Sequence, residues 1–131
     1  MSDEPSILLL DSDVVSRQAI AQYLRECGYK VREAIDTDEA MAILTQGGAT
    51  VDILLADVTA AGKLDGFGLA RWVRKSRPDI KIILVGTVAG EALKAADLCH
   101  EGPQLSKPYH PQLLIDRIKR MIATRERGGK S

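Results

Sequence analysis

The chain has 131 residues, of which 45% are hydrophobic and 27% are charged. This length is typical of one domain, and this composition is typical of a globular fold rather than of a disordered, collagen-like or coiled-coil chain. Its 18 Lys and Arg residues balance 18 Asp and Glu residues, so no overall field attracts it to nucleic acid or to an anionic membrane. We therefore expect a single domain that has no nucleic-acid partner and no membrane partner.

The N-terminal residues and the cysteines favour a cytoplasmic location. Residues 1–5 are acidic where a signal peptide would be basic, and no apolar run approaches the ~20 residues that a membrane span needs. Cys27 and Cys99 lack the paired spacing of a zinc site. We expect reduced thiols, a cytoplasmic protein and a short N-terminal extension over residues 1–5.

Short apolar runs predict the strands. Residues 7–10, 51–56 and 80–85 are apolar with few interruptions, which is typical of strands buried on both faces of a parallel sheet. Residues 29–34 alternate in polarity and predict an edge strand, while residues 103–106 predict a short one.

Helical periodicity fills the stretches between these runs. A first helix is predicted over residues 14–27, and a second begins after Asp36, which has Glu39 three residues on as in a capping box. Asp65 caps a third helix that ends before Pro78. The remaining predicted elements are a helix over residues 91–99, a helix over residues 111–123 and a flexible tail over residues 124–131.

Five strands that alternate with five helices predict a three-layer, doubly wound α/β sandwich around a parallel sheet. In such folds ligands bind beyond the carboxyl ends of the strands, and polar residues of this chain cluster there. The candidate site residues at those ends are Asp11, Ser12, Asp13, Asp57, Gly86, Thr87, Lys107 and Pro108.

These residue types suit phosphoryl chemistry. Carboxylates on neighbouring strands repel each other, so such a group usually holds a cation unless one carboxylate is protonated. Oxygen ligands favour Mg²⁺, and the Lys107 ammonium opposite Asp57 would complete a pocket for a phosphoryl group. Asp57 is the candidate nucleophile, because aspartate carboxylates can form acyl-phosphates.

From residue 6 to residue 122 the chain resembles a response-regulator receiver domain of the CheY type. The residues that carry the resemblance are the strand that ends at Asp11, the run from Asp52 to Val58, the Leu64-Asp65-Gly66 turn, Arg77-Pro78-Asp79, and the run from Leu105 to Tyr109. The resemblance implies a flavodoxin-like sheet in strand order 2-1-3-4-5, a receiver domain over residues 6–123 and a cis peptide before Pro108.

The resemblance also implies roles for the site residues. Asp57 would accept a phosphoryl group from a histidine kinase or phosphotransfer protein, and an unidentified downstream protein would read the change. Asp11, Asp57 and the backbone carbonyl of Thr59 would bind Mg²⁺, with Asp13 and Ser12 as further candidates. Lys107 and either Thr87 or Gly86 would contact the phosphate.

Four features depart from the family pattern. Ser12 stands where a second adjacent acid is usual, which predicts weaker metal binding unless Asp13 bends back into the site. The loop after Asp57 lacks the usual Met-Pro pair and is one residue longer. Gly86 occupies the position of the switch hydroxyl with Thr87 next to it, and Gln104 replaces the usual aromatic residue. Either Thr87 substitutes by a local shift or the switch is missing.

We consider three functions. The first is a non-enzymatic signalling receiver that is phosphorylated on Asp57 and acts by altered protein contacts. The second is a pseudo-receiver that binds its partner independently of phosphorylation, and the departures at Ser12, Gly86 and Gln104 favour it.

The third function is a phosphatase, because residues 8–15 resemble the first motif of haloacid-dehalogenase-type enzymes. In that class Asp11 would be the nucleophile and Asp13 the general acid/base. A later pair of metal-binding acids is required there, but only Asp116 follows Lys107 before the tail.

Overall fold

The computed structural model describes residues 5–46, 50–86, 105–106 and 111–128. Its strands form one five-stranded sheet in the order β2-β1-β3-β4-β5, in which every pairing is parallel. The elements are β1 (Ser6–Leu10), α1 (Val14–Glu26), β2 (Lys30–Ala34), α2 (Thr37–Thr45), β3 (Ile53–Asp57), α3 (Gly66–Ser76), β4 (Lys81–Gly86), β5 (Leu105–Ser106) and α5 (Pro111–Gly128). The predicted fold class and strand order are therefore confirmed.

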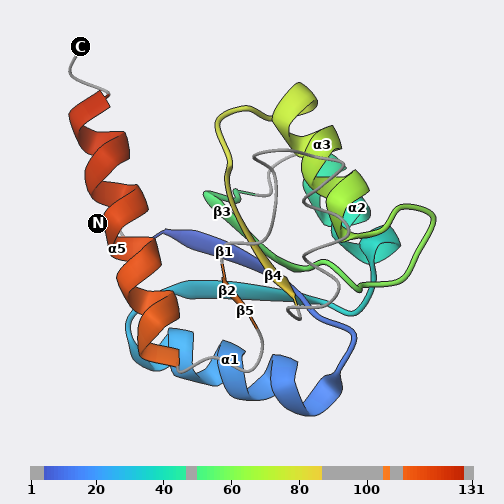
Figure 1. Ribbon diagram of the computed structural model, residues 1–131, viewed down its shortest axis with the longest axis horizontal. Helices are drawn as coiled ribbons and strands as arrows, with labels where there is room; N and C mark the ends of the chain where they lie inside the picture. The colour runs from blue at the N-terminus through green and yellow to red at the C-terminus, as the bar shows by residue number, and fades with distance from the viewer. Residues whose placement is uncertain (1–4, 47–49, 87–104, 107–110, 129–131) are drawn as a thin grey trace.

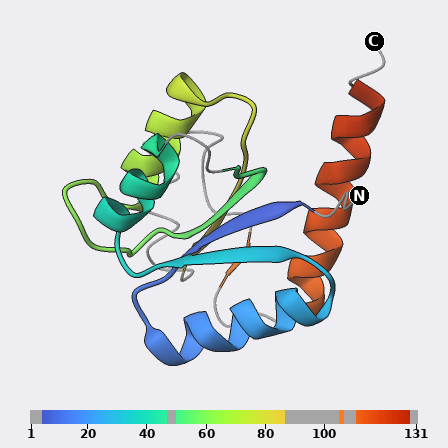
Figure 2. The same cartoon turned by 180° about the vertical axis from the view of Figure 1, so that it is seen from behind.

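The described helices cover both faces of the sheet. Figures 1 and 2 show α2 and α3 together on one side of the strands, with α1 and α5 on the other side. Leu8 and Leu54 belong to the buried cluster that α2 and α3 complete, whereas Ile7 and Leu9 belong to the cluster formed with α1 and α5. Successive strand residues thus enter opposite cores, which explains why the strands are apolar without alternation.

Local capping sets the start of three helices, and the sequence predicts two of these caps, at Asp36 and Asp65. The carboxylate of Asp13 accepts a hydrogen bond from the Val15 amide and caps α1. Asp36 caps α2, and Asp65 caps α3 by accepting from the Gly68 amide at 2.7 Å. These bonds satisfy amide groups that the first turn of a helix leaves without partners.

The helix α5 is longer than expected. It continues to Gly128, although the sequence predicts a flexible tail from residue 124. No Gly or Pro interrupts residues 112–127, and the Arg and Glu residues at its end are good helix formers. The predicted helix over residues 91–99 lies outside the described residues.

Candidate functional site

The sheet brings Asp11 and Asp57 to neighbouring positions. Leu10 of β1 pairs with Ala56 of β3, so the next residue along each chain is one of these two aspartates. Both side chains lie at the carboxyl end of the sheet and are nearly buried, with 5% of Asp11 and 7% of Asp57 exposed. The predicted meeting of these two carboxylates at one rim is therefore supported by the register of the central strands.

Asp11 is held by both its backbone and its carboxylate. Its amide donates to the carbonyl of Ala34 at 3.1 Å, which ties it to the end of β2. Its Oδ1 accepts from the amide of Asp13 at 2.9 Å, and its own carbonyl accepts from Nη1 of Arg17 at 3.1 Å. The carboxylate is thus oriented by the turn that leads into α1.

Arg17 supports the position of Asp11, although its place in the sequence does not reveal this role. Only 8% of it is exposed, and its Nε donates to Oε1 of Glu33 at 3.0 Å. Glu33 also binds the more exposed Arg25, whose Nη1 lies 3.2 Å from Oε2. In sequence, Arg17 is one more polar residue on an amphipathic helix, so no local signal distinguishes it from a solvated side chain.

Asp57 is held by the residue two positions later. Its Oδ1 accepts from the Thr59 amide at 2.8 Å and from the Thr59 hydroxyl at 2.7 Å. The backbone around it is also fixed, because the amide of Val58 donates to the carbonyl of Val85 on β4 at 2.8 Å. Thr59, predicted only as a carbonyl ligand, therefore also contacts the candidate phosphoacceptor through its hydroxyl and amide.

The other two candidates before α1 make different bonds. The hydroxyl of Ser12 donates to the carbonyl of Ile35 at 2.9 Å, and Asp13 caps α1. Both side chains are exposed. In the described contacts they link turns and stabilise a helix end, while Asp11 and Asp57 are the buried pair.

The fourth strand reaches the same rim. Val85 pairs with Asp57, and the next residue, Gly86, pairs with Ser106 of β5. Gly86 therefore lies one position beyond the pairing partner of Asp57. The remaining candidates, which are Thr87, Lys107 and Pro108, fall outside the described residues.

The oxygen donors at the ends of β1 and β3 fit a hard cation. Two buried carboxylates and nearby backbone carbonyls supply only oxygen, and Mg²⁺ binds through one or two carboxylates while it keeps several waters. Among the residues that the structure describes, no three His, Cys, Asp or Glu side chains gather into a metal site. Two buried carboxylates at neighbouring strand ends match the one or two that a partly hydrated Mg²⁺ uses, rather than the four ligands of a closed structural metal.

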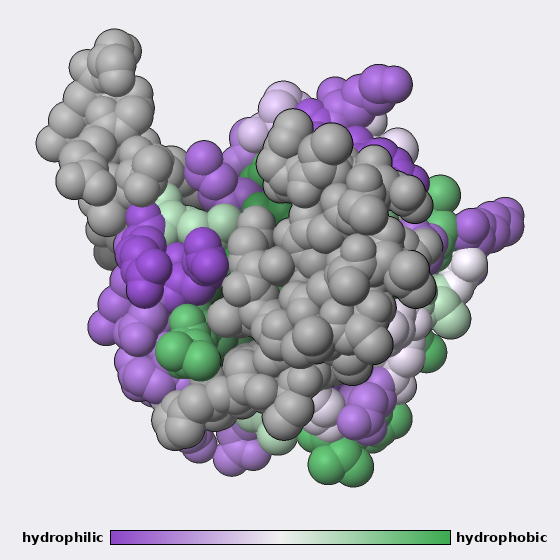
Figure 3. Space-filling model, viewed as in Figure 1, coloured by the Kyte–Doolittle hydropathy of each residue, from purple (hydrophilic) through white to green (hydrophobic). Residues whose placement is uncertain are grey.

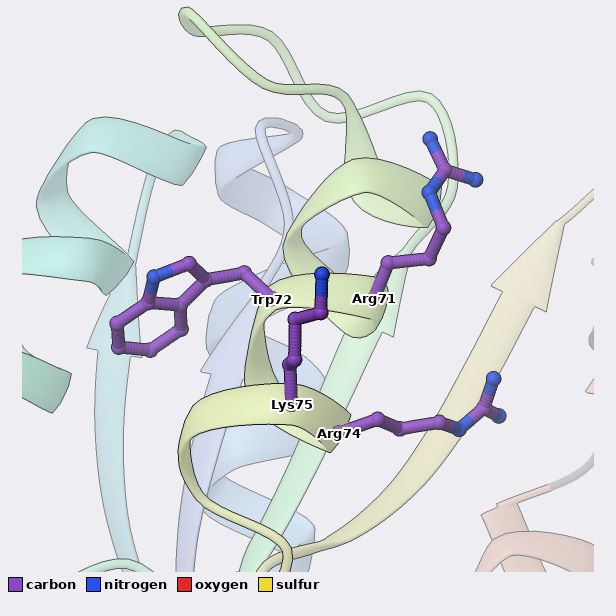
Figure 4. Close-up of a pocket in the computed structure, with 4 residues that line it drawn as sticks. All are labelled: Arg71, Trp72, Arg74 and Lys75. Carbon is purple, nitrogen blue, oxygen red and sulfur yellow. The ribbon is translucent and has the colours of Figure 1, made fainter.

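A cavity on α3 lies away from the aspartates and has different chemistry. It has a volume of about 510 Å³ and is lined by Arg71, Trp72, Arg74 and Lys75 of α3 (Figure 4). Trp72 extends toward α2 and packs against the core. None of these four side chains is a nucleophile or a metal ligand for the predicted reaction, so we place the site at the aspartates and not in this cavity.

The visible surface carries no extended apolar patch in its described part. Figure 3 shows hydrophilic residues beside α5 and small, separate hydrophobic areas between them. None of the helices in the described part of the chain is long and apolar enough to span a membrane.

A doubly wound sheet with two buried aspartates at the ends of β1 and β3 has the layout of a CheY-type receiver. A family model described as the response regulator receiver domain matches residues 7–119. The chain therefore belongs to the response regulator receiver domain family and is a receiver domain of two-component signal transduction.

Individual relatives agree with this assignment. The chain is 33% identical over 124 residues to the sensor kinase CckA of Brucella abortus, covering 93% of this chain and 13% of that protein. It is 30% identical over 117 residues to the response regulator receiver protein CpdR of Brucella abortus, covering 88% of this chain and 95% of that protein. Of the transcriptional regulatory protein AruR of Pseudomonas aeruginosa, 33% identical over 126 residues, it spans 51%. The chain thus spans about half or less of some of the curated relatives it matches.

Solved structures show the same fold. A response regulator receiver domain protein from Clostridium thermocellum matches with a TM-score of 0.79 and 26% identity, covering 93% of this chain and 97% of that one. NtrX from Brucella abortus matches with a TM-score of 0.82 and 25% identity, covering 97% of this chain and 29% of that one. These comparisons favour the receiver over the pseudo-receiver and the phosphatase considered from the sequence.

Proposed function

We propose that Asp57 accepts a phosphoryl group from a histidine kinase or a histidine phosphotransfer protein. A carboxylate oxygen of Asp57 attacks the phosphorus, a new oxygen–phosphorus bond forms, and the nitrogen–phosphorus bond to the donor histidine breaks with its electron pair left on the imidazole. The observation that carries this proposal is the nearly buried pair of Asp11 and Asp57 at the carboxyl ends of two central strands.

Asp11, Asp57 and the backbone carbonyl of Thr59 are the proposed ligands of Mg²⁺, with Asp13 and Ser12 as further candidates. When bound, the ion would neutralise charge on the phosphoryl group. The contacts of Asp11 support its role as a ligand, because the Asp13 amide orients its carboxylate and Arg17 holds its backbone carbonyl. Thr59 supports it because its amide and hydroxyl hold Asp57 Oδ1.

The phosphate contacts remain a proposal from the sequence. Lys107 would supply a positive charge, and either Thr87 or the backbone at Gly86 would donate a hydrogen bond to a phosphoryl oxygen. Pro108 would shape the turn after Lys107. The position of Gly86, one residue beyond the partner of Asp57 in β4, supports a role for the end of that strand.

The proposed domain bounds, location and partners are consistent with this function. We propose a receiver over residues 6–123, with residues 1–5 as an extension and residues 124–131 as a tail whose first part continues α5. It acts in the cytoplasm through altered contacts with a downstream protein, without a catalytic turnover of its own and without binding nucleic acid or membrane.

Phosphorylation with a small-molecule donor tests this function. The protein is incubated with phosphoramidate and a series of MgCl2 concentrations, and its intact mass is measured. We expect a gain of one phosphoryl group that requires Mg²⁺, that is absent in Asp57→Asn and that needs more Mg²⁺ in Asp11→Asn. Asp116→Asn is the matched control, because Asp116 lies on α5 and accepts from Gln112.

The opposite outcome is equally clear. A wild-type protein that gains no phosphoryl group at any Mg²⁺ concentration would contradict the proposal and favour the pseudo-receiver. Release of inorganic phosphate from a phosphate monoester, abolished by Asp11→Asn, would favour the phosphatase.

A further inference from the structure

The loop between β3 and α3 is bonded at both ends. Near Asp57, Thr59 donates two hydrogen bonds to the carboxylate, and farther along the loop the backbone contacts the first turn of α2. We propose that Thr37, the first residue of α2, is a positioning residue for the Asp57 site and acts on it through this loop. The inference rests on the proposed phosphorylation of Asp57.

Thr37 is built to hold a loop. Only 1% of it is exposed, so its polar groups are removed from water. Its amide donates to the carbonyl of Ala61 at 2.8 Å, and its hydroxyl donates to the carbonyl of Leu64 at 2.6 Å. Thr37 thus binds two backbone carbonyls, one on each side of Gly62 and Lys63. Loss of the hydroxyl would leave the Leu64 carbonyl without this donor.

At Gly62 the backbone of the loop lies so close to Thr37 that no side chain fits between them. Gly62 has a φ of +135°, and a Cβ atom built on it would overlap Oγ1 of Thr37. A third bond joins the same two segments, because the amide of Lys63 donates to Oδ1 of Asp38 at 3.3 Å. The contact between loop and helix is therefore specific in backbone conformation as well as in hydrogen bonding.

The path from Thr37 to Asp57 is short. Ala61, which accepts from Thr37, lies two residues after Thr59, and the intervening Ala60 is buried in the core cluster that contains Leu54 and Ala40. The amide of Ala60 also donates to the carbonyl of Asp57 at 3.1 Å. A shift of the loop at Ala61 therefore displaces Thr59 relative to the carboxylate that it binds.

This loop needs an anchor because its sequence is permissive. It contains Gly62 and lacks proline, so its unfolded or detached state has many conformations. Thr37 restricts those conformations from the α2 side. The expected consequence of losing the hydroxyl is a loop that holds Thr59 against Asp57 for a smaller fraction of the time.

The test compares two threonines of the same helix. Thr37→Val removes the hydroxyl with little change in volume, and Thr37→Ser keeps it. Thr45→Val is the matched control, because the Thr45 hydroxyl bonds to the Met41 carbonyl within α2 at 2.9 Å. Amide hydrogen exchange of Thr59 is followed by NMR in the unphosphorylated proteins, and the rate of phosphorylation by phosphoramidate is measured at several Mg²⁺ concentrations.

In Thr37→Val we expect exchange of the Thr59 amide to become about five- to tenfold faster, the factor that corresponds to one lost hydrogen bond. We expect phosphorylation to slow by a similar factor. Thr37→Ser and Thr45→Val should both resemble the wild type. If Thr37→Val does not fold, Thr37→Ala takes its place in both measurements.

Exchange of the Thr59 amide that is the same in Thr37→Val and Thr45→Val would overturn the inference, as would a phosphorylation rate that Thr37→Val leaves unchanged. The exchange measurement requires no phosphoryl group, so it separates this inference from the proposed function. A wild-type protein that is never phosphorylated refutes the function, whereas unchanged exchange in Thr37→Val refutes the role of Thr37.

Discussion

Arg17 provides a sharp test of how the turn after β1 is stabilised. Its guanidinium is almost buried, and it donates to the Asp11 carbonyl at 3.1 Å and to Glu33 at 3.0 Å. Arg17→Met retains much of the side-chain volume but removes the charge and both donors. The Asp11 carbonyl then loses a hydrogen-bond donor beside the candidate site. Glu33 loses the less exposed of its two arginine partners and keeps Arg25.

The magnitude follows from these two bonds. A hydrogen bond to or from a charged group is worth about 1.5–3 kcal/mol, and breaking a fully buried ion pair costs about 3–5 kcal/mol. The Glu33 side chain is 26% exposed and keeps Arg25 as a second partner, so water and Arg25 reduce the penalty. We therefore expect Arg17→Met to lower the free energy of unfolding by about 2–3 kcal/mol.

Arg25→Met is the matched control, because Arg25 binds the same glutamate but its side chain is 48% exposed. We expect it to cost no more than about 1 kcal/mol. Urea denaturation followed by circular dichroism measures both variants, and Arg17→Met should lower the midpoint by about 1–2 M. Equal losses in the two variants, or a loss below about 0.5 kcal/mol in Arg17→Met, would refute the role assigned to the buried arginine.

Three further outcomes follow from the structure. Asp65→Ala removes the cap of α3 and should cost about 1 kcal/mol in urea denaturation, whereas Asp65→Asn should retain most of that stability. Mg²⁺ at 100 times its dissociation constant should stabilise the folded wild type by about 2.7 kcal/mol. The melting temperature of the wild type should therefore rise with Mg²⁺, whereas that of Asp11→Asn should change little. Burial, with a smaller effect of the Cys27 charge, raises the pKa of Tyr29 above its ordinary value of 10.0. Because the folded state keeps this proton longer, the associated stability is complete below pH 10.0 and is lost as the pH rises through the folded pKa. Tyr29→Phe should therefore weaken the alkaline loss of stability, and an unchanged denaturation profile between the two proteins would contradict this.

The sheet was predictable because its signals are local or nearly so. Residues 7–10 are apolar without a break, and the two faces of β1 enter two different cores. The caps at Asp36 and Asp65 were also predictable, since each carboxylate binds an amide three residues later. Asp11 and Asp57 could be placed at one rim because parallel strands end at the same edge of a sheet.

Contacts between distant segments required the folded structure. Three polar residues follow the ends of strands in the sequence and look equivalent there: Ser12, Asp13 and Thr59. In the fold they make different hydrogen bonds, because Ser12 binds the Ile35 carbonyl, Asp13 caps α1 and Thr59 binds Asp57. The extent of α5 beyond residue 124 was likewise unpredicted.

Arg17 and Thr37 show the same division most clearly. Both are polar residues at or near the start of helices, and their neighbours in sequence do not reveal that they are buried. The hydroxyl of Thr37 reaches a carbonyl 27 residues away in the loop after β3, a pairing that arises only when α2 packs on the sheet that contains β3. Hydrophobic periodicity and capping act over a few residues and can be recognised in the chain, whereas the partners of a buried polar group depend on which segments the completed core brings together.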